Sequence, residues 1–468
     1  MKELLELLRR EPAYRKLAAA NFVSGLGDWF SSVAILGLLL QITGSGMAVG
    51  ITLAARTLPY LVMGPIGGVL ADKGGKKTLL IVSDFSRIAL ALSLLLVDSP
   101  DRVWIAYAAT VGLVIFSALA LPARQSLIPR IVRRENLPAA NALDQTLGGM
   151  NMTLGAVLGG AASAAFGPQL SFLFNAATFL ASGLLVCTLP YGRGRKPDGS
   201  GVKGAGRKSR PAADGPGVAS AESAAADAGQ ARLAAGANAA QDPLASAAAN
   251  AENEADASAF WRTFRRSMLM KVVAVQSIAW PIGGGAINVL ISVYGYQVFG
   301  GGDRGVGLLY GSLGVGFVLG GLLAPSFKRW PVQALILGAA AEGLAHVGVS
   351  AAPSLLPAAA CIMLATLGGG VGNTALTTLI MRAVPENVHG RAFALNETLA
   401  NVTMGVSMLV AGLLLDVLPA RTIGLIAGLM IVASCIPALA LLRQRRTLNS
   451  EAAGQGGGRL AQAGGEAS

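Results

Sequence analysis

Long apolar runs recur along this chain, separated by short polar segments. Each run is about as long as the roughly 20 residues that a helix needs to cross a bilayer. Twelve runs meet this condition, at 18–41, 47–71, 78–97, 103–123, 140–166, 170–189, 269–298, 305–326, 332–350, 355–381, 392–415 and 421–442. The pattern predicts an all-α membrane protein with twelve transmembrane helices, arranged as six before and six after a long polar segment.

That polar segment differs in composition from the rest of the chain. Between Pro190 and Phe260 the sequence is rich in Gly, Ala, Ser and Pro, with a basic stretch at 193–210 and an acidic stretch at 214–256. It has too few large apolar side chains to form a core, so we interpret it as a disordered linker, with docking of a regulatory partner as the alternative. The predicted organisation is an N-terminal segment at 1–17, a first six-helix bundle at 18–190, the linker at 191–259, a second six-helix bundle at 260–443 and a disordered tail at 444–468.

Composition supports the membrane class. Of 468 residues 53% are apolar and only 13% are charged, a combination that ordinary soluble domains do not show at this length. The net charge of +12 would suggest nucleic acid as partner of a soluble protein, but in a membrane protein the distribution of Lys and Arg among loops matters more. We therefore expect no nucleic-acid partner. Three cysteines and two histidines without ligand spacing predict no metal site.

Lys and Arg are concentrated in alternate loops. If the N-terminus lies inside, only Arg102, Arg304 and Arg421 fall outside. The inner segments then hold Lys2, Arg9, Arg10, Arg15, Lys16, Lys73, Lys76, Lys77, Arg124, Arg130, Arg133, Arg134, Lys328, Arg329, Arg382, Arg391, the linker and the tail from Arg443. By the positive-inside rule this predicts a multi-pass protein of the cell (cytoplasmic) membrane with both termini in the cytoplasm.

A short, strongly charged turn separates the second and third apolar runs. Its sequence is Gly68-Val-Leu-Ala-Asp72-Lys73-Gly-Gly75-Lys76-Lys77-Thr-Leu-Leu80. The turn resembles the loop between helices 2 and 3 of the major facilitator superfamily of transporters, whose pattern is G-x-L-a-D-r-x-G-r-k-x-x-l. The matching positions are Gly68, Leu70, Ala71, Asp72, Gly75 and Leu80, with Lys73, Lys76 and Lys77 as the basic positions.

Other segments are similar to the enterobactin- and macrolide-exporter branch of that superfamily. They are Gly27-Asp28-Trp29, Leu53-Ala-Ala-Arg56-Thr-Leu-Pro59, Ser83-Asp84-Phe-Ser-Arg87, Pro122-Ala-Arg124-Gln125, Asn141-Ala-Leu143, Gly284-Gly285-Ala-Ile-Asn288-Val-Leu290, Val384-Pro385-Glu386 and Gly390-Arg391-Ala-Phe393-Ala. The resemblance implies two pseudo-symmetric bundles that rock about a central substrate site, and export of hydrophobic drugs or secondary metabolites against protons. One departure concerns the fifth span, where Gly155-Ala156-Val-Leu-Gly159-Gly160 lacks the proline of the antiporter motif, which leaves direction and coupling open.

Few ionisable residues fall inside the apolar runs, and each is a functional candidate because a charge in lipid is costly. Asp28 and Arg56 both fall near the predicted midplane. One interpretation makes Asp28 the proton-coupling acid, with its charged form stabilised by Arg56. The alternative is a permanent ion pair that ties spans one and two together.

Two further acids are candidates for proton coupling. Glu342 and His346 are four residues apart and share one face of span nine, as a proton relay would require. In the resembled fold span nine does not line the cavity, which favours a structural polar pair instead. Glu397, near the inner end of span eleven, either couples to Asp72 in an inner gate or anchors its helix end.

The charged turn itself predicts a cytoplasmic gate. Asp72 can face the N-terminal dipole of span eleven and Arg124, and so hold the halves together on the inner side in an outward-open state. The alternative for Lys73, Lys76 and Lys77 is a role in topology alone, which explains most of their charge. The predicted gate motif consists of Gly68, Asp72, Gly75, Lys76, Lys77 and Arg124.

Helix order places spans one, four, seven and ten around the predicted cavity. Its candidate lining residues are Trp29, Phe116, Trp280, Asn288 and Asn373. We expect a proton-coupled exporter of hydrophobic or amphipathic small molecules, a monomer in the lipid bilayer that uses the proton gradient and no cofactor, and not an enzyme. The alternatives are a dedicated siderophore or metabolite exporter, an uptake symporter, and, in another class, a transporter-like membrane sensor or scaffold.

Overall fold

The computed structural model describes residues 2–72, 75–189, 267–327, 329–383 and 389–440, and every regular element in these ranges is a helix. The predicted linker at 191–259 and tail at 444–468 lie outside the described residues. The predicted all-α membrane class is confirmed: eleven helical segments are long and apolar enough to span a bilayer. The remaining long helix, α7, has 30 residues and packs between α2 and α12.

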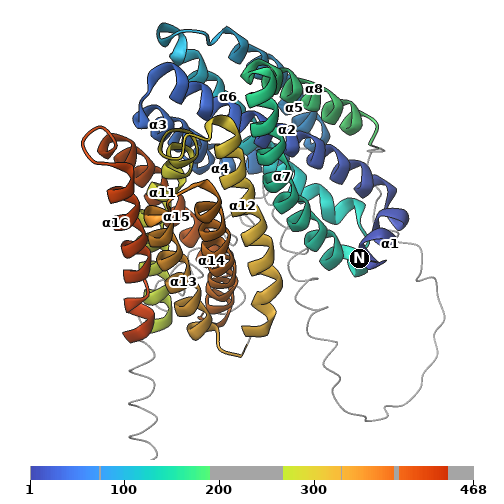
Figure 1. Ribbon diagram of the computed structural model, residues 1–468. Coiled ribbons are helices and arrows are strands. Elements are labelled where there is room, and N and C mark those ends of the chain that lie inside the picture. The colour runs from blue at the N-terminus through green and yellow to red at the C-terminus, as the bar shows by residue number, and fades with distance from the viewer. Residues whose placement is uncertain (1, 73–74, 190–266, 328, 384–388, 441–468) are drawn as a thin grey trace, which may run out of the picture.

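The N-terminal half begins with a short amphipathic helix that leads into the first span (Figure 1). Its helices are α1 (Lys2–Arg10), α2 (Pro12–Thr43), α3 (Gly46–Thr57), α4 (Pro59–Asp72), α5 (Lys76–Ser93), α6 (Val103–Ile131), α7 (Leu137–Phe166) and α8 (Pro168–Cys187). The predicted second span is divided into α3 and α4 at Leu58, because Pro59 has no N–H with which to continue the helical ladder.

The C-terminal half repeats the arrangement of long antiparallel helices. Its elements are α11 (Met268–Val293), the π-helical turn η4 (Tyr294–Val298), α12 (Gly302–Leu323), η5 (Ala324–Phe327), α13 (Pro331–Ala351), α14 (Leu355–Ala383), α15 (His389–Leu414) and α16 (Ala420–Ala433). The last predicted span continues beyond α16, since the apolar helical segment extends to Ala440.

The two halves meet along two helix pairs, α7 with α12 and α3 with α15. Glycines make this seam possible. A Cβ atom added at Gly160 of α7 would lie 2.5 Å from the carbonyl oxygen of Asp303, and one added at Gly307 of α12 would lie 2.6 Å from that of Ala156. In lipid no hydrophobic effect drives helices together, so this close van der Waals contact is what stabilises the seam.

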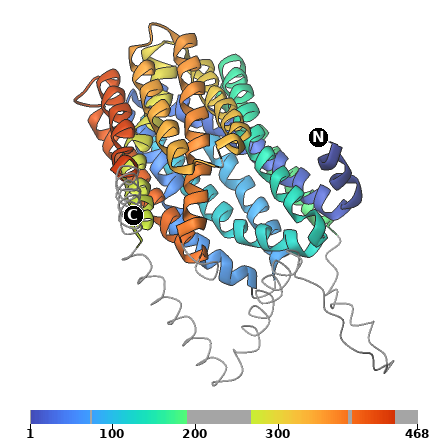
Figure 2. The same ribbon diagram turned by 90° about the horizontal axis from the view of Figure 1, so that it is seen from below.

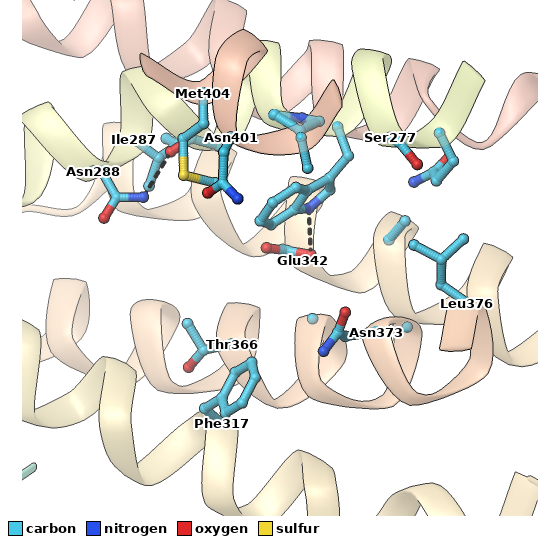
Figure 3. A pocket seen from close by; sticks show the side chains of 18 of the residues that line it. Ser277, Ile287, Asn288, Phe317, Glu342, Thr366, Asn373, Leu376, Asn401 and Met404 are labelled. Carbon is cyan, nitrogen blue, oxygen red and sulfur yellow. Dashed lines mark hydrogen bonds between the residues drawn. The ribbon is translucent and has the colours of Figure 1, made fainter. Parts of the chain in front are cut away.

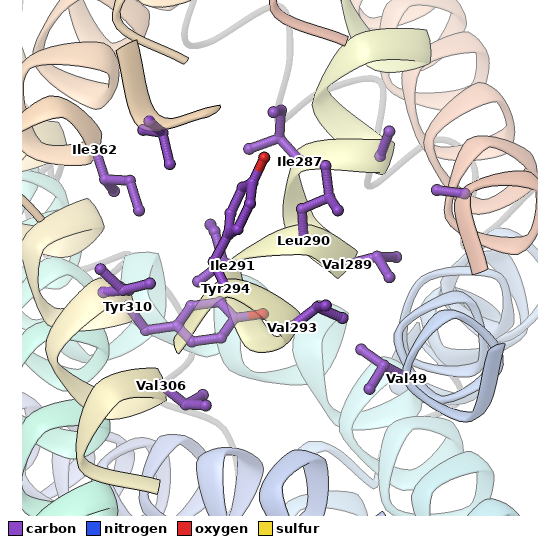
Figure 4. Close-up of a cluster of buried hydrophobic side chains, with 14 of the residues drawn as sticks. Val49, Ile287, Val289, Leu290, Ile291, Val293, Tyr294, Val306, Tyr310 and Ile362 are labelled. Atoms are coloured by element: carbon purple, nitrogen blue, oxygen red, sulfur yellow. The ribbon is translucent and has the colours of Figure 1, made fainter. Parts of the chain in front are cut away.

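Apolar side chains from both halves fill the space beside the seam. Val49 of α3 faces Val293 of α11, and Tyr294 and Tyr310 lie behind them (Figure 4). All four side chains are buried, with less than 5% of their surface exposed. The largest buried cluster therefore belongs to neither half alone, and it joins the halves at one end of the molecule.

A carboxylate is enclosed in the same seam. Asp303, at the start of α12, accepts a hydrogen bond from the Ser163 hydroxyl of α7 and lies over Gly37 of α2, where any side chain would overlap it. One of its oxygens, Oδ1, is buried without a hydrogen-bond partner. Separating the halves at this end would expose that oxygen to new partners.

The halves diverge toward the opposite end. In Figure 1, α7 and α12 lie side by side near the top and separate toward the end that carries α1, and Figure 2 views the molecule from that end. Gly64, Gly68, Gly148 and Gly321 have nothing within 4 Å of an added Cβ atom. The two halves are thus in close contact at the seam, and their helices diverge away from it.

Filling the seam should open it. We expect Gly307→Leu to lower the unfolding temperature in detergent and to raise the rate at which a maleimide labels a cysteine placed at Ser163, because the new side chain meets backbone that cannot move aside. Overpacking of this kind costs about 1–3 kcal/mol. Gly321→Leu, in the same helix but facing open space, is the control and should change neither measurement. Equal effects from both variants would contradict the account of the seam.

Candidate functional site

One guanidinium joins two carboxylates in the interior of the N-terminal half. Arg87 of α5 donates through NH1 to Asp28 Oδ2 at 3.2 Å and through NH2 to Asp84 Oδ1. Asp28 lies near the middle of the 32-residue α2, so the cluster is placed deep in the bundle. Charged side chains in a membrane interior require such pairing, because lipid cannot solvate them.

The two carboxylates differ in their surroundings. Asp84 is 7% exposed and also accepts a hydrogen bond of 2.7 Å from the Ser182 hydroxyl, whereas the Asp28 side chain is 32% exposed and borders the interior cavity. The Arg87 guanidinium lies 4.2 Å above the ring of Phe179, which orients it. Asp84 therefore binds Arg87 within the protein, and Asp28 is the acid that can respond to the cavity.

The prediction that Asp28 forms an ion pair with Arg56 is wrong, because the cation that binds Asp28 is Arg87. Arg56 donates instead to the Ser32 hydroxyl, and Ser32 donates to the backbone carbonyl of Asp28. Arg87 reaches the Asp28 carboxylate from α5 because α2 contacts α8 and α8 contacts α5, which brings the three helices together. Arg56 remains beside the site and lines the same cavity.

A second ion pair lines the same cavity of the N-terminal half that Asp28 and Arg56 border. Arg124 of α6 donates through NH2 to Asp144 Oδ2 of α7 at 3.3 Å and through NH1 to the Asn21 side chain. The cavity has a volume of about 470 Å³, and Trp29 and Arg56 also line it. Arg124 was predicted to bind Asp72 in the inner gate, but the structure pairs it with Asp144. The side chain of Asp72 lies outside the described residues, so the latch remains a prediction.

The charged turn has a structural role that the motif did not indicate. Lys77 donates to the backbone carbonyls of Cys187 at 2.7 Å and Leu189 at 2.8 Å, at the C-terminal end of α8. These carbonyls have no partner within the helix, and a cation is favourable at the negative end of the helix dipole. Lys76 is buried, and Gly75 directly precedes α5. The lysines thus do more than determine topology.

The C-terminal half has its own cavity, of about 350 Å³ (Figure 3). Trp280, Asn288 and Asn373, all predicted to line a cavity, line this one. Trp29 lines the N-terminal cavity, with its ring centroid 6.1 Å from that of Tyr310. Phe116 lines neither cavity, and its backbone carbonyl accepts a hydrogen bond from Ser83. Whether these side chains contact substrate stays a prediction.

Span nine reaches this cavity, which corrects the expectation that it would not. Glu342 and His346 of α13 both line it, and Glu342 Oε2 accepts a hydrogen bond of 2.9 Å from the Trp280 indole nitrogen. Glu397 lines the cavity as well, and its side chain accepts a long hydrogen bond, 3.5 Å, from Asn401. In the described part of the chain no group of three or more His, Cys, Asp or Glu side chains is placed to hold a metal ion.

A sequence model of the Major Facilitator Superfamily matches residues 17–350 and 328–463, together almost the whole chain. The chain belongs to the major facilitator superfamily. This is a family of transporters and not of enzymes, and the predicted resemblance is confirmed. The chain is a multi-pass membrane protein of this superfamily.

Curated relatives match at low identity. The chain is 28% identical over 185 residues to the uncharacterized MFS-type transporter YfiS of Bacillus subtilis (39% of this chain, 44% of the relative). It is 29% identical over 199 residues to the multidrug efflux pump Tap of Mycolicibacterium fortuitum (41% and 48%), and 28% identical over 181 residues to the enterobactin exporter EntS of Citrobacter koseri (38% and 43%). The matched region spans less than half of the length of each of these relatives.

Solved structures support the major facilitator fold. The nucleoside transporter NupG superposes with a TM-score of 0.66 at 11% identity, over 92% of this chain and 99% of that one. A bacterial homologue of the iron transporter ferroportin, in an inward-facing state, superposes with a TM-score of 0.61 at 14% identity, over 91% and 98%. At such identities the likeness concerns the fold alone.

Sequence reasoning noted the segment with Asp84 and Arg87 as part of the superfamily resemblance but gave these residues no role, and it overlooked Asp144. The signal was present, since Asp84 and Arg87 are intramembrane charges three residues apart on one helix face. What was absent was any indication of which neighbouring helix this face meets.

Removing the shared cation should destabilise the N-terminal bundle. We expect Arg87→Gln to cost about 3–5 kcal/mol in unfolding free energy, because two carboxylates are left without their cation. The double variant Arg87→Gln with Asp84→Asn should recover part of that loss. Thermal unfolding in detergent measures both. The control is Arg102→Gln, whose pair with Asp98 is more than half exposed and contributes about 0–1 kcal/mol. A loss no larger for Arg87→Gln than for this control would contradict the assignment.

Proposed function

We propose that this protein is a secondary active transporter that exports hydrophobic or amphipathic small molecules in exchange for protons, by alternating access of a central site. The observation that carries the proposal is the Asp28–Arg87–Asp84 cluster, in which the partly exposed Asp28 borders a cavity inside the N-terminal bundle. Small-molecule substrate, protons and lipid are the partners that it requires, and a monomer suffices.

Charge balance supports Asp28 as the proton-coupling acid. Two carboxylates share one guanidinium, so the cluster has a net charge of −1 when both acids are ionised and is neutral when one holds a proton. Asp84 also accepts a hydrogen bond from Ser182, so both of its oxygens have donors within the protein. Asp28, which borders the cavity, is therefore the acid that can exchange a proton with it, and gain or loss of that proton changes the charge of the site by one unit in a poorly solvated environment.

The same helix connects this acid to the seam. Asp28 and Gly37 are both on α2, about 13 Å apart at 1.5 Å of rise per residue. Gly37 lies directly against Asp303 of α12. A change in the position of α2 on protonation of Asp28 thus acts on the contact that holds the halves together. With both termini in the cytoplasm, as the distribution of Lys and Arg predicts, the seam contact lies toward the outer side and forms the outer gate.

The names of two relatives favour export. One relative is a multidrug efflux pump and another an enterobactin exporter, although each matches over less than half of its length. The C-terminal cavity combines aromatic and apolar walls with a few polar groups, which is typical of sites for small amphipathic ligands, whereas the N-terminal cavity is lined mostly by polar and charged side chains. Dedicated export of one siderophore or metabolite is the narrower form of the proposal, and uptake by symport is the opposite direction.

Transport in inverted membrane vesicles tests the proposal. With a panel of dyes, macrolides and siderophores, we expect proton-gradient-dependent accumulation of at least one compound by the wild type. Asp28→Asn should abolish the dependence on the gradient, whereas Asp98→Asn, which removes an exposed acid, should not. Full proton-driven efflux by Asp28→Asn would refute the coupling role. No movement of any compound by the wild type would favour a sensor or scaffold.

The predicted gate is tested in the same vesicles. Asp72→Asn should slow turnover severalfold while leaving the amount of membrane-inserted protein unchanged, because an uncharged side chain no longer attracts the helix dipole of α15. Lys77→Gln is the comparison, since it removes a cap of α8 and should lower stability more than turnover. Unchanged turnover in Asp72→Asn would count against the latch.

A further inference from the structure

The carboxyl group of Glu342 reaches the C-terminal cavity through a gap in the wall of helix α14. Helices α13 and α14 approach closely because both carry glycine at their contact: a Cβ atom on Gly338 would lie 2.6 Å from the carbonyl oxygen of Gly368. One residue further, a Cβ atom on Gly369 would lie 3.0 Å from both Cδ and Oε2 of Glu342. Any other side chain at position 369 would crowd this carboxyl and force it to shift.

The carboxyl is buried and has few polar partners. Glu342 is 6% exposed, and the Trp280 indole is the hydrogen-bond donor placed against it. A carboxylate offers about four acceptor sites. Ionised and buried with a single neutral donor, it would be strongly disfavoured. It must therefore either hold a proton or be matched by a positive charge.

No such charge comes from the walls of the cavity. The titratable groups around Glu342 are His346 one turn further along α13, the Cys435 thiol beyond α16, and Glu397 of α15 across the cavity. His346 is buried, with its Nδ1 atom unpartnered. Neither Lys nor Arg is among the described residues that line the cavity. In the N-terminal half, by contrast, Arg87 supplies the cation for Asp28 and Asp84.

The rest of the wall suits an apolar body. Phe317 and Met404 line the cavity beside Trp280, together with the amides of Asn288 and Asn373 (Figure 3). A volume of about 350 Å³ lies within the range of small-molecule sites. An acid without a cation, at the side of an aromatic and aliphatic cavity, has the chemistry to bind an organic ammonium group.

We propose that Glu342 is the anchor for a protonated amine carried by an aromatic ligand, and that a proton and this amine compete for the same carboxyl. In the empty cavity Glu342 holds a proton. When the ammonium group binds, the carboxyl O–H bond breaks, the proton leaves to solvent, and the carboxylate pairs with the ligand cation, so the charge of the site is conserved. The inference rests on the proposed function, which makes this cavity a ligand-binding site, but it concerns binding and not transport.

Binding of two matched probes to the purified protein tests this inference. The probes are 2-(1-naphthyl)ethylamine, which is an ammonium ion at pH 7, and its neutral N-acetyl derivative. We expect the wild type in detergent to bind the amine about tenfold more tightly than the amide, because an ionic hydrogen bond is formed only with the amine. In weakly buffered solution a pH dye should report about one proton released per amine bound and none per amide.

Variants assign the effect to Glu342. Glu342→Gln should abolish proton release and bring the two affinities within about twofold. Glu6→Gln is the matched control, because it removes an exposed acid outside the cavity and should leave both readouts unchanged. Glu397→Gln removes the other acid of the cavity, and the amine should still bind more tightly than the amide. Gly369→Ala displaces the carboxyl without removing it and should weaken amine binding. This variant replaces Glu342→Gln as the test if Glu342→Gln does not fold.

Three results would overturn the inference. In the first, the wild type binds the amine and the amide equally well, or binds neither. In the second, proton release persists in Glu342→Gln. In the third, the preference for the amine is lost in Glu397→Gln and not in Glu342→Gln. Since the assay needs no membrane gradient, a protein that binds the amine with proton release but transports nothing would refute the proposed function and leave this inference intact. Proton-driven export of a compound, together with failure of the amine-binding assay, would do the reverse.

Discussion

The guanidinium of Arg87 is the point on which the N-terminal half depends. It lies where water is scarce, holds Asp28 of α2 and Asp84 of its own helix, and stacks on Phe179 of α8. Each of these charges alone would be costly in lipid, so the three helices are stable in this arrangement only together. The sharing is also unequal, because Asp84 has a further donor and Asp28 borders the cavity. A structural ion pair and a responsive acid are thus parts of one cluster.

Glycine determines where helices can approach, and this governs both the seam and the cavities. At Gly160 and Gly307 the backbones of the two halves are in contact. At Gly369 the lack of a side chain leaves room beside α14 for the Glu342 carboxyl. In lipid such contacts replace the hydrophobic effect as the source of helix association. Because they are made of many weak van der Waals interactions without ion pairs, a seam of this kind can open at modest cost.

The two halves share a topology but treat charge differently. The N-terminal half pairs its interior acids with its own arginines, namely Arg87 with Asp28 and Asp84, and Arg124 with Asp144. In the C-terminal cavity Glu342 has the Trp280 indole as its partner and no cation in the wall. In the N-terminal half these acids therefore form ion pairs within the protein, whereas in the C-terminal cavity Glu342 could pair with the positive charge of a ligand. Such asymmetry is what the proposed exchange of two different ligands would require.

The sequence by itself determined the membrane class, the positions of the spans and the superfamily. Hydrophobicity acts on each segment separately, since every span must be apolar and satisfy its own backbone hydrogen bonds in lipid, and the charged turn at Gly68–Leu80 is a local motif. The choice of partners was decided only by the tertiary structure. Arg87 rather than Arg56 binds Asp28, Arg124 binds Asp144, and Glu342 reaches the cavity from a span expected to be peripheral. These contacts depend on how each helix is rotated about its axis and on which helix lies beside it, and both are set by glycine contacts between residues far apart in the chain.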